Sequence, residues 1–189
     1  MKRLGPWQPA TAEERLDRLE SLAAIQQLAY RYGVAVDSRD MDLLVDLFVP
    51  DVRVGRDRTG RDALKRWFTT VMSRPQSTCH FVGNHMVDFD DADHARGIVY
   101  CHDELDNPDK GGWVHGQLQY WDTYRRVDGE WYFERRKFLR LYVADWLSQP
   151  VHGAGLAGDR GSLTAVQLPD AYPSWNRFWR QVQKEQADS

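Results

Sequence analysis

The chain has 189 residues, a formal net charge of −3 and charges of both signs along its whole length. This balance gives no electrostatic case for nucleic acid or an anionic membrane as a partner, and no apolar run approaches the roughly 20 residues of a membrane-spanning helix. The first residues are basic but lack a following apolar stretch, so we expect no signal peptide. We expect one domain in the cytoplasm, with Cys79 and Cys101 as buried free thiols.

The first helix is predicted over residues 12–36, beginning with the capping-box pair Thr11 and Glu14. Apolar residues recur along it at helical spacing, at Leu19, Leu22, Ile25, Leu28 or Ala29, Tyr32, and Ala35 or Val36. Asp37 takes the next inward position, although a carboxylate has no packing reason to lie there. Asp40 is a good N-cap for a second helix, so we expect Asp37 at an elbow between two helices.

The rest of the chain predicts an α+β fold, in which three helices precede an antiparallel meander. After the first helix we expect helices at 41–48 and 60–72, with a short strand at 51–58 between them. Beyond Pro75 the apolar period changes from about 3.6 to 2. This predicts strands at 78–89 with a break at Gly83-Asn84, at 94–105, at 113–127 and at 130–145, the last two joined by a tight turn at Asp128-Gly129.

We expect these strands to form a strongly bent mixed or antiparallel sheet, wrapped around the helices as a cone with a small-molecule cavity. The domain is expected to span residues 12–147, and residues 148–189 to form a C-terminal extension. This extension is predicted to carry a short helix that Ser174 caps and that bears two tryptophans and a phenylalanine. Such a helix must pack on something, and the sequence leaves open whether it closes its own cone or contacts a neighbouring subunit.

Three stretches resemble the SnoaL-like branch of the nuclear transport factor 2 superfamily: AAIQQLAYRYGVAVDSRDMDLLVDLFVPDV, TCHFVGN and RRVDGEWYFERRKF. The resemblance covers about residues 15–145 and is similar in pattern to scytalone dehydratase, bile-acid 7α-dehydratase and hexachlorocyclohexane dehydrochlorinase. It implies a cone-shaped α+β fold and a homo-oligomer, with a trimer favoured over a dimer. It also implies enzymes that use no metal and no organic cofactor.

The resemblance further implies site residues. The Asp–His pair shared by those enzymes falls on Asp37 and His80, and Tyr32 matches a tyrosine five residues before the aspartate of the bile-acid enzyme. Scytalone dehydratase differs, since it has a tyrosine where this chain has Val36, and its second catalytic tyrosine falls near Arg56. Its phenol-rich, water-polarising arrangement is therefore not expected here.

The chemistry of such a pair can be argued from the residues alone. An elimination without a cofactor needs a base to take a proton beside an activating group and an acid to help the leaving group depart. Imidazole titrates near about pH 6.5 and can do both, provided that a carboxylate holds it in one tautomer. Asp37 on a buried stripe and His80 in a strand suit this arrangement, and a purely structural hydrogen bond between them is the alternative.

Four other histidines lie in the predicted strands, at His85, His94, His102 and His115. Three of them together would suffice to bind zinc. However, no His-x-His or His-x-x-x-His spacing occurs, and no acidic residue lies at ligand spacing beside them. We therefore expect no metal site and interpret them as ordinary strand or surface histidines.

Alternation along the last two strands places a set of polar and aromatic residues on the sides that, by the resemblance, face the cavity. The candidate substrate-binding residues are Arg56, Tyr120, Arg136, Phe138 and Arg140. Inward arginines would favour an anion, a phenolate or a developing enolate, and Tyr32 would polarise a carbonyl or a leaving group. The alternatives are that the arginines pair with acids or face solvent, and that Tyr32 is a core aromatic.

Three hypotheses about function follow. The leading one is a cofactor-independent lyase of dehydratase type that acts on a hydrophobic, aromatic or polycyclic small molecule. Loss of halide or formaldehyde, or an isomerase or cyclase reaction, would use the same layout of base and acid. The second is a non-catalytic β-type subunit of an aromatic ring-hydroxylating dioxygenase, associated with a large iron-binding subunit. The third is a small-ligand-binding or interaction domain.

Overall fold

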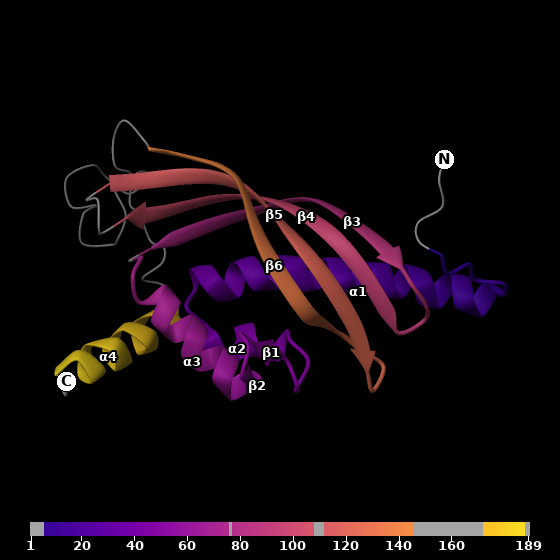
Figure 1. The fold of residues 1–189 in the computed structure, drawn as a ribbon, viewed down its shortest axis with the longest axis horizontal. Helices are drawn as coiled ribbons and strands as arrows, with labels where there is room; N and C mark the ends of the chain where they lie inside the picture. Colours follow the sequence, from indigo (N-terminus) through magenta and orange to yellow (C-terminus); the bar gives the residue numbers. More distant parts are fainter. Residues whose placement is uncertain (1–5, 76, 108–111, 146–171, 188–189) are drawn as a thin grey trace.

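The computed structural model describes residues 6–75, 77–107, 112–145 and 172–187 (Figure 1). Its helices are α1 (Ala12–Asp37), α2 (Met41–Asp46), α3 (Arg61–Met72) and α4 (Pro173–Ala187). Its strands are β1 (Arg53–Val54), β2 (Arg58–Thr59), β3 (Thr78–Phe89), β4 (His94–Asn107), β5 (Gly112–Val127) and β6 (Glu130–Asp145). The predicted α+β order, with helices first and long strands after them, is confirmed.

The main sheet has the order β3-β4-β5-β6, and each strand pairs antiparallel with the next. It arches over α1, which lies along its concave side and contacts both edge strands, β3 and β6 (Figure 1). A parallel bridge between Phe48 and Phe133 fastens the segment after α2 to β6. The sheet is therefore curved and antiparallel, with α1 inside the curve.

The hydrophobic core fills the space between α1 and the concave face of the sheet. Every second side chain of a strand points to this face. On β5 and β6 the inward rows include Tyr120, Tyr124 and Phe133, none of them more than 3% exposed. The buried residues of α1 recur at helical spacing from Ser21 to Val36.

A bulge interrupts β3 between Val82 and His85, at the predicted break. In a regular strand, residues an odd number apart point to opposite faces. The extra residue of the bulge cancels this alternation, so both His80 and His85 face the concave side although they are five positions apart.

The N-terminal helices follow the sequence prediction with two exceptions, of which the first is that α2 ends at Asp46 and not at residue 48. The capping box of Thr11 and Glu14 and the N-cap of Asp40 are both present. Leu19, however, is 64% exposed and does not belong to the buried stripe. The reason is that Leu19 lies about 120° around the helix from Ile25, the centre of the buried face.

The prediction of a single strand over residues 51–58 is wrong. Two strands of two residues each, β1 and β2, instead pair as an antiparallel hairpin. The chain turns at Gly55, whose φ of +69° is the left-handed conformation that glycine adopts without strain. Arg56 lies in this turn and is exposed.

The C-terminal helix α4 packs beside α3, on the side of the molecule below the sheet (Figure 1). It has 15 residues and begins at Pro173, so Ser174 is not its N-cap as predicted. Phe178 and Val182 join the main core cluster, which shows that α4 packs on its own chain. Most of the predicted extension before α4 falls on residues 146–171, outside the described residues.

Both cysteines are free thiols, as predicted. Cys101 is buried, but Cys79 is exposed, contrary to the prediction. Cys79 alternates with Thr78 and His80 on β3, which point to the concave face, and so it points to the outer face. Among the described helices, none combines the length and the apolar character needed to cross a bilayer.

Candidate active site

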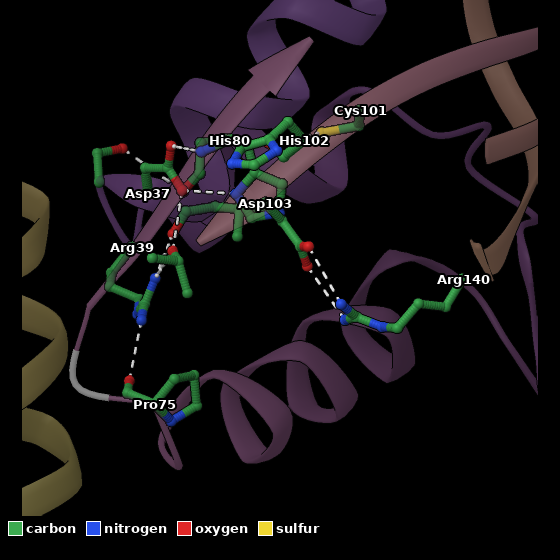
Figure 2. Close-up of polar contacts among 12 residues, drawn as sticks. Asp37, Arg39, Pro75, His80, Cys101, His102, Asp103 and Arg140 are labelled. Atoms are coloured by element: carbon green, nitrogen blue, oxygen red, sulfur yellow. Dashed lines mark hydrogen bonds and ion pairs between the residues drawn. The ribbon is translucent and has the colours of Figure 1, made fainter. Parts of the chain in front are cut away.

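Asp37, the last residue of α1, and His80 of β3 meet directly (Figure 2). The Nδ1 atom of His80 lies 2.7 Å from Oδ1 of Asp37, and the backbone N–H of His80 donates to Oδ2 at 2.8 Å. The side chains of His80 and Asp37 are 10% and 20% exposed. The structure thus brings together the two residues that the sequence singled out, in a mostly buried position close to the surface.

Asp37 needs several donors because of its place in α1. The free carbonyls at the C-terminal end of a helix disfavour a carboxylate, and no basic residue lies in the last turn of α1 to offset them. The start of β3 supplies the compensation. In addition to the two His80 contacts, the hydroxyl of Thr78 donates to Oδ1 of Asp37 at 2.9 Å.

The hydrogen-bond pattern assigns the proton on the His80 ring. An ionised carboxylate only accepts hydrogen bonds, so the hydrogen between Asp37 and His80 belongs to Nδ1. In a neutral imidazole the other nitrogen, Nε2, then carries a free lone pair. No residue in the described ranges hydrogen-bonds to Nε2 of His80, so this lone pair is available to act as a base.

An ion pair between a buried aspartate and a partly exposed arginine adjoins this site on the concave face. Asp103 of β4 is the register partner of His80, and its two carboxylate oxygens accept from Arg140 of β6, each at 3.1 Å (Figure 2). The Asp103 side chain is 4% exposed and the Arg140 side chain 30%. Gly116 of β5 lies between them, and a Cβ there would lie 2.2 Å from Nη1 of Arg140 and 2.6 Å from Oδ1 of Asp103. The pair can span β5 because Gly116 has no side chain.

A second ion pair lies deeper under α1. Arg136 donates from Nε and Nη2 to the two carboxylate oxygens of Asp122, at 3.0 and 2.8 Å, and neither side chain is more than 4% exposed. Its guanidinium also lies 4.0 to 4.3 Å from the ring centroids of Tyr120, Phe133 and Tyr32. Burial alone would lower the pKa of Arg136, but the carboxylate of Asp122 outweighs burial and the pKa is raised.

The tyrosines around Arg136 are neutral phenols. Burial raises the pKa of Tyr32 to about 12, partly offset by the positive charge of Arg136. Burial also raises the pKa of Tyr120 well above its usual value. Both side chains therefore keep their hydroxyl protons at neutral pH and can donate hydrogen bonds.

His85 extends the deeper network. Its Nε2 lies 2.9 Å from the Tyr124 hydroxyl, which itself donates to Asp122 at 2.9 Å. Because the Tyr124 proton is directed to Asp122, Nε2 of His85 must be the donor, and the tautomer is opposite to that of His80. Burial lowers the pKa of His85 to about 4, with Asp122 acting against this shift, so the ring is neutral at pH 7.

The predicted binding residues divide into three groups. Tyr120, Arg136 and Arg140 face inward. Both arginines also pair with acids. Facing inward and pairing with an acid were alternatives in the sequence analysis, and in the structure both apply to each arginine. Phe138 is 48% exposed and makes an edge-type ring contact with Tyr120, with ring centroids 6.1 Å apart. Arg56, exposed in the β1–β2 turn, is not brought to the site.

Sequence reasoning did not single out Thr78, Asp103 or Arg39 as parts of the site. Thr78 could have been found, because it shares a face of the predicted strand with His80. Asp103 could not have been found in this way, because its place beside His80 depends on the register of β3 against β4, and the sequence does not reveal this register. On the outer face, His102 contacts Glu104 and Gln117. In the described part of the chain, no three His, Cys, Asp or Glu side chains are grouped so as to hold a metal ion.

A family model described as the SnoaL-like domain matches residues 17–137, well over half of the chain. The chain belongs to the SnoaL-like family. The matched region includes Asp37 and His80 and ends before Arg140 and α4.

Solved structures similar to this SnoaL-like chain agree with the resemblance to the nuclear transport factor 2 superfamily. A scytalone dehydratase-like protein from Novosphingobium aromaticivorans is 25% identical, with a TM-score of 0.60 over 70% of this chain and 92% of that one. A hexachlorocyclohexane dehydrochlorinase from Novosphingobium barchaimii is 26% identical, with a TM-score of 0.65 over 74% and 99%. An aromatic ring hydroxylase-like protein from N. aromaticivorans is 25% identical, with a TM-score of 0.57 over 74% and 97%.

The space at Gly116 gives a first prediction for this SnoaL-like domain. Gly116→Ala places a methyl group against Asp103 and Arg140, so the ion pair must open and the free energy of unfolding should fall by about 1–3 kcal/mol in urea titrations. Gly112→Ala is the matched control, since a Cβ at this position of β5 meets nothing within 4 Å. Equal stability of the two variants would show that the glycine is not needed for the pair.

The half-buried ring of His85 gives a second prediction. The unfolded chain binds a proton at this residue near pH 6.5, but the folded chain binds it only near pH 4. Stability contributed by His85 is therefore complete above about pH 6.5 and is lost as the pH falls towards 4, on the order of 2 to 3 kcal/mol. The difference in unfolding free energy between wild type and His85→Gln, measured across this range, should follow that curve.

Tyr124→Phe separates the two possible causes. It removes the hydroxyl partner of His85 but keeps the ring that buries it. If burial sets the pKa, this variant keeps the pH dependence of the wild type, and a flat profile would identify the hydrogen bond as the cause instead.

Proposed function

We propose that this chain is a cofactor-independent lyase that acts on a hydrophobic, aromatic or polycyclic small molecule, with His80 as general base and acid. The observation that carries the proposal is the contact between Asp37 and His80. Asp37 holds Nδ1 of His80 in its protonated form at 2.7 Å and leaves Nε2 as a free base. This is the tautomer that abstraction of a proton from carbon requires.

The proposed reaction needs one proton acceptor and one leaving group. Nε2 of His80 takes a proton from a carbon next to an activating group, and the electron pair of that C–H bond forms a double bond as the bond to the leaving group breaks. A halide leaves with its own electron pair. A hydroxyl group leaves as water after it receives the proton back from the imidazolium. Asp37 stabilises the imidazolium between these two steps.

Charge that develops on the substrate needs positive or donor groups nearby. Arg140 suits this role, because its side chain is 30% exposed and belongs to the ion pair beside His80. Arg136 is buried against three aromatic rings, so we assign it the role of holding these rings in place and not of contacting the substrate. We assign Tyr32, a neutral phenol beside Arg136, as a donor to a carbonyl or leaving-group oxygen.

The comparisons support the reaction class. Two similar solved structures carry the names of a dehydratase and a dehydrochlorinase, and both reactions eliminate a group from carbon. We favour loss of water, with loss of halide or formaldehyde, or an isomerase or cyclase reaction, as alternatives that need the same base. The resemblance to an aromatic ring hydroxylase-like protein keeps the dioxygenase-subunit hypothesis as a second candidate.

Substitution of the pair tests the proposal. We expect the wild type to dehydrate β-hydroxyketones or dehydrochlorinate γ-hexachlorocyclohexane, and to open 5-nitrobenzisoxazole, a probe whose ring opens after removal of one C–H proton. His80→Ala should lower these rates to the level of buffer. Asp37→Asn should lower these rates about 10³-fold or more. An amide N–H that donates to Nδ1 of His80 favours the tautomer with its proton on Nε2, which cannot act as the base.

The control for these variants is His94→Ala. His94 also contacts an aspartate, Asp91, at 3.0 Å, but the pair is exposed and lies away from the concave face. This variant should keep the wild-type rates. Wild-type rates in both His80→Ala and Asp37→Asn would contradict the mechanism, and co-purification with a large iron–sulfur subunit would favour the dioxygenase reading.

We also propose the homo-oligomer that the resemblance implies, with a trimer favoured over a dimer. Sedimentation velocity of the purified chain tests this directly, and a monomer at micromolar concentration would contradict it.

A further inference from the structure

Arg39 occupies an unusual position two residues after Asp37. It lies at the elbow between α1 and α2 with a φ of +56°, and its side chain is among the largest that are fully buried, with 1% exposed. Its Nη1 donates to the carbonyl of Val36 at 2.6 Å, and its Nη2 donates to the carbonyl of Pro75 at 3.0 Å (Figure 2). Arg39 therefore links the last turn of α1, which carries Asp37, to the segment that leads into β3, which carries His80.

Arg39 also acts on the hydroxyl group that contacts Asp37. Its Nη1 lies 2.9 Å from Oγ1 of Thr78, and Oγ1 lies 2.9 Å from Oδ1 of Asp37. A guanidinium only donates, so Thr78 must accept from Arg39 with a lone pair. Its single hydroxyl hydrogen is then left for Asp37. Arg39 thus holds the Thr78 hydroxyl group from one side while its hydrogen points to the carboxylate that orients His80.

The other face of the guanidinium is covered by α4. The ring of Trp175 lies 5.0 Å from the Arg39 guanidinium carbon, and this tryptophan is only 6% exposed. Next to it, the hydroxyl of Ser174 donates to the carbonyl of Ser38 at 2.8 Å. The first turn of α4 therefore contacts the elbow directly behind Asp37. Because the family match ends at residue 137, this helix lies outside the shared domain.

We propose that Arg39 is a positioning residue for the Asp37–His80 pair, and that α4 holds Arg39 in place through Trp175 and Ser174. The inference rests on the proposed function, because it assigns a role in setting the geometry of the same base. It adds that the C-terminal helix, far from the pair in sequence, belongs to the catalytic apparatus. Removing the contact between Trp175 and Arg39 should let the His80 ring move more freely, while His80 itself is retained as the base.

The charge of Arg39 is maintained in this buried place. Burial lowers its pKa to about 10, while Asp37 and Asp106 act in the opposite direction, so the guanidinium is still protonated at pH 7. A buried cation costs desolvation that an apolar side chain of similar length would avoid. Arg39→Met keeps most of the packing volume and removes only the donors and the charge.

The primary test is substrate-free and follows the His80 ring by nitrogen and proton NMR. In the wild type we expect a downfield Nδ1–H signal that is protected from exchange with water. In Arg39→Met this signal should move upfield and exchange at least about tenfold faster, because α1 and β3 are no longer tied at the elbow. With 5-nitrobenzisoxazole, kcat should fall about tenfold while KM stays within about twofold.

A double-mutant cycle tests whether Arg39 acts through Thr78. Thr78→Val removes the hydroxyl but leaves the two carbonyl contacts of Arg39, and Thr78→Ser restores the hydroxyl. The variant that combines Arg39→Met with Thr78→Val should lose no more kcat than the larger single loss. Full additivity of the two losses would overturn the proposed link.

The role of α4 is tested at Trp175, which also covers the case that Arg39→Met fails to fold. Trp175→Leu removes the aromatic face and should reproduce the NMR and kcat changes, whereas Trp175→Phe should retain most of the wild-type behaviour. The matched control is Arg126→Met, since Arg126 also lies 5.0 Å from a tryptophan ring, that of Trp131, and pairs with Asp17 near the start of α1. It should lower stability without changing the His80 signal or kcat.

The outcomes separate this inference from the proposed function. Unchanged His80 signals and kcat in folded Arg39→Met or Trp175→Leu would overturn the positioning role. If these variants change the Nδ1–H signal while His80→Ala keeps full turnover, the positioning role stands and the proposed lyase mechanism fails.

Discussion

The structure depends on how the carboxylate of Asp37 is satisfied at the C-terminal end of α1. The helix offers it no compensation, so its donors must come from another element, and the start of β3 provides three of them. This requirement fixes the end of α1 against β3. The two elements lie close together one turn earlier as well, where a Cβ on Gly33 would be in van der Waals contact with His80 and Val82 at 3.4 Å. The geometry of the base is therefore a by-product of burying one acidic group.

Two further carboxylates on the concave face also receive their hydrogen-bond donors from another element. Asp103 and Asp122 are both almost fully buried, and each is paired in two contacts with an arginine from β6. Burying these charges is tolerable only because every carboxylate oxygen has a donor. The sheet thus encloses two carboxylates with fixed partners, and aromatic rings cover the deeper of the two pairs. Such an interior keeps its dipoles oriented without help from water, which is the condition under which a charge that develops during a reaction is stabilised effectively.

Much of this could be predicted from the sequence, and the limits have physical causes. Asp37 and His80 stood out because one interrupts a helical stripe and the other lies in an alternating run, and both signals are local. The inward sides of β5 and β6 followed from alternation in the same way. The acids that pair with Arg136 and Arg140 did not, because pairing depends on strand register. Arg39 was out of reach, since its contacts at Pro75, Thr78 and Trp175 come from three distant segments. Arg56 was misplaced because Gly55 turns a short alternating run into a hairpin.

The bulge in β3 shifts the alternation of inward and outward side chains by one residue, so the strand has two parts. The first part carries His80 at the edge of the site, and the second carries His85 within the core network. The two imidazoles have opposite tautomers because their hydrogen-bond partners differ, although they share one strand and one face. Without this one inserted residue, the second imidazole would point to the outer face of the sheet, and the buried network around Asp122 would lose its histidine.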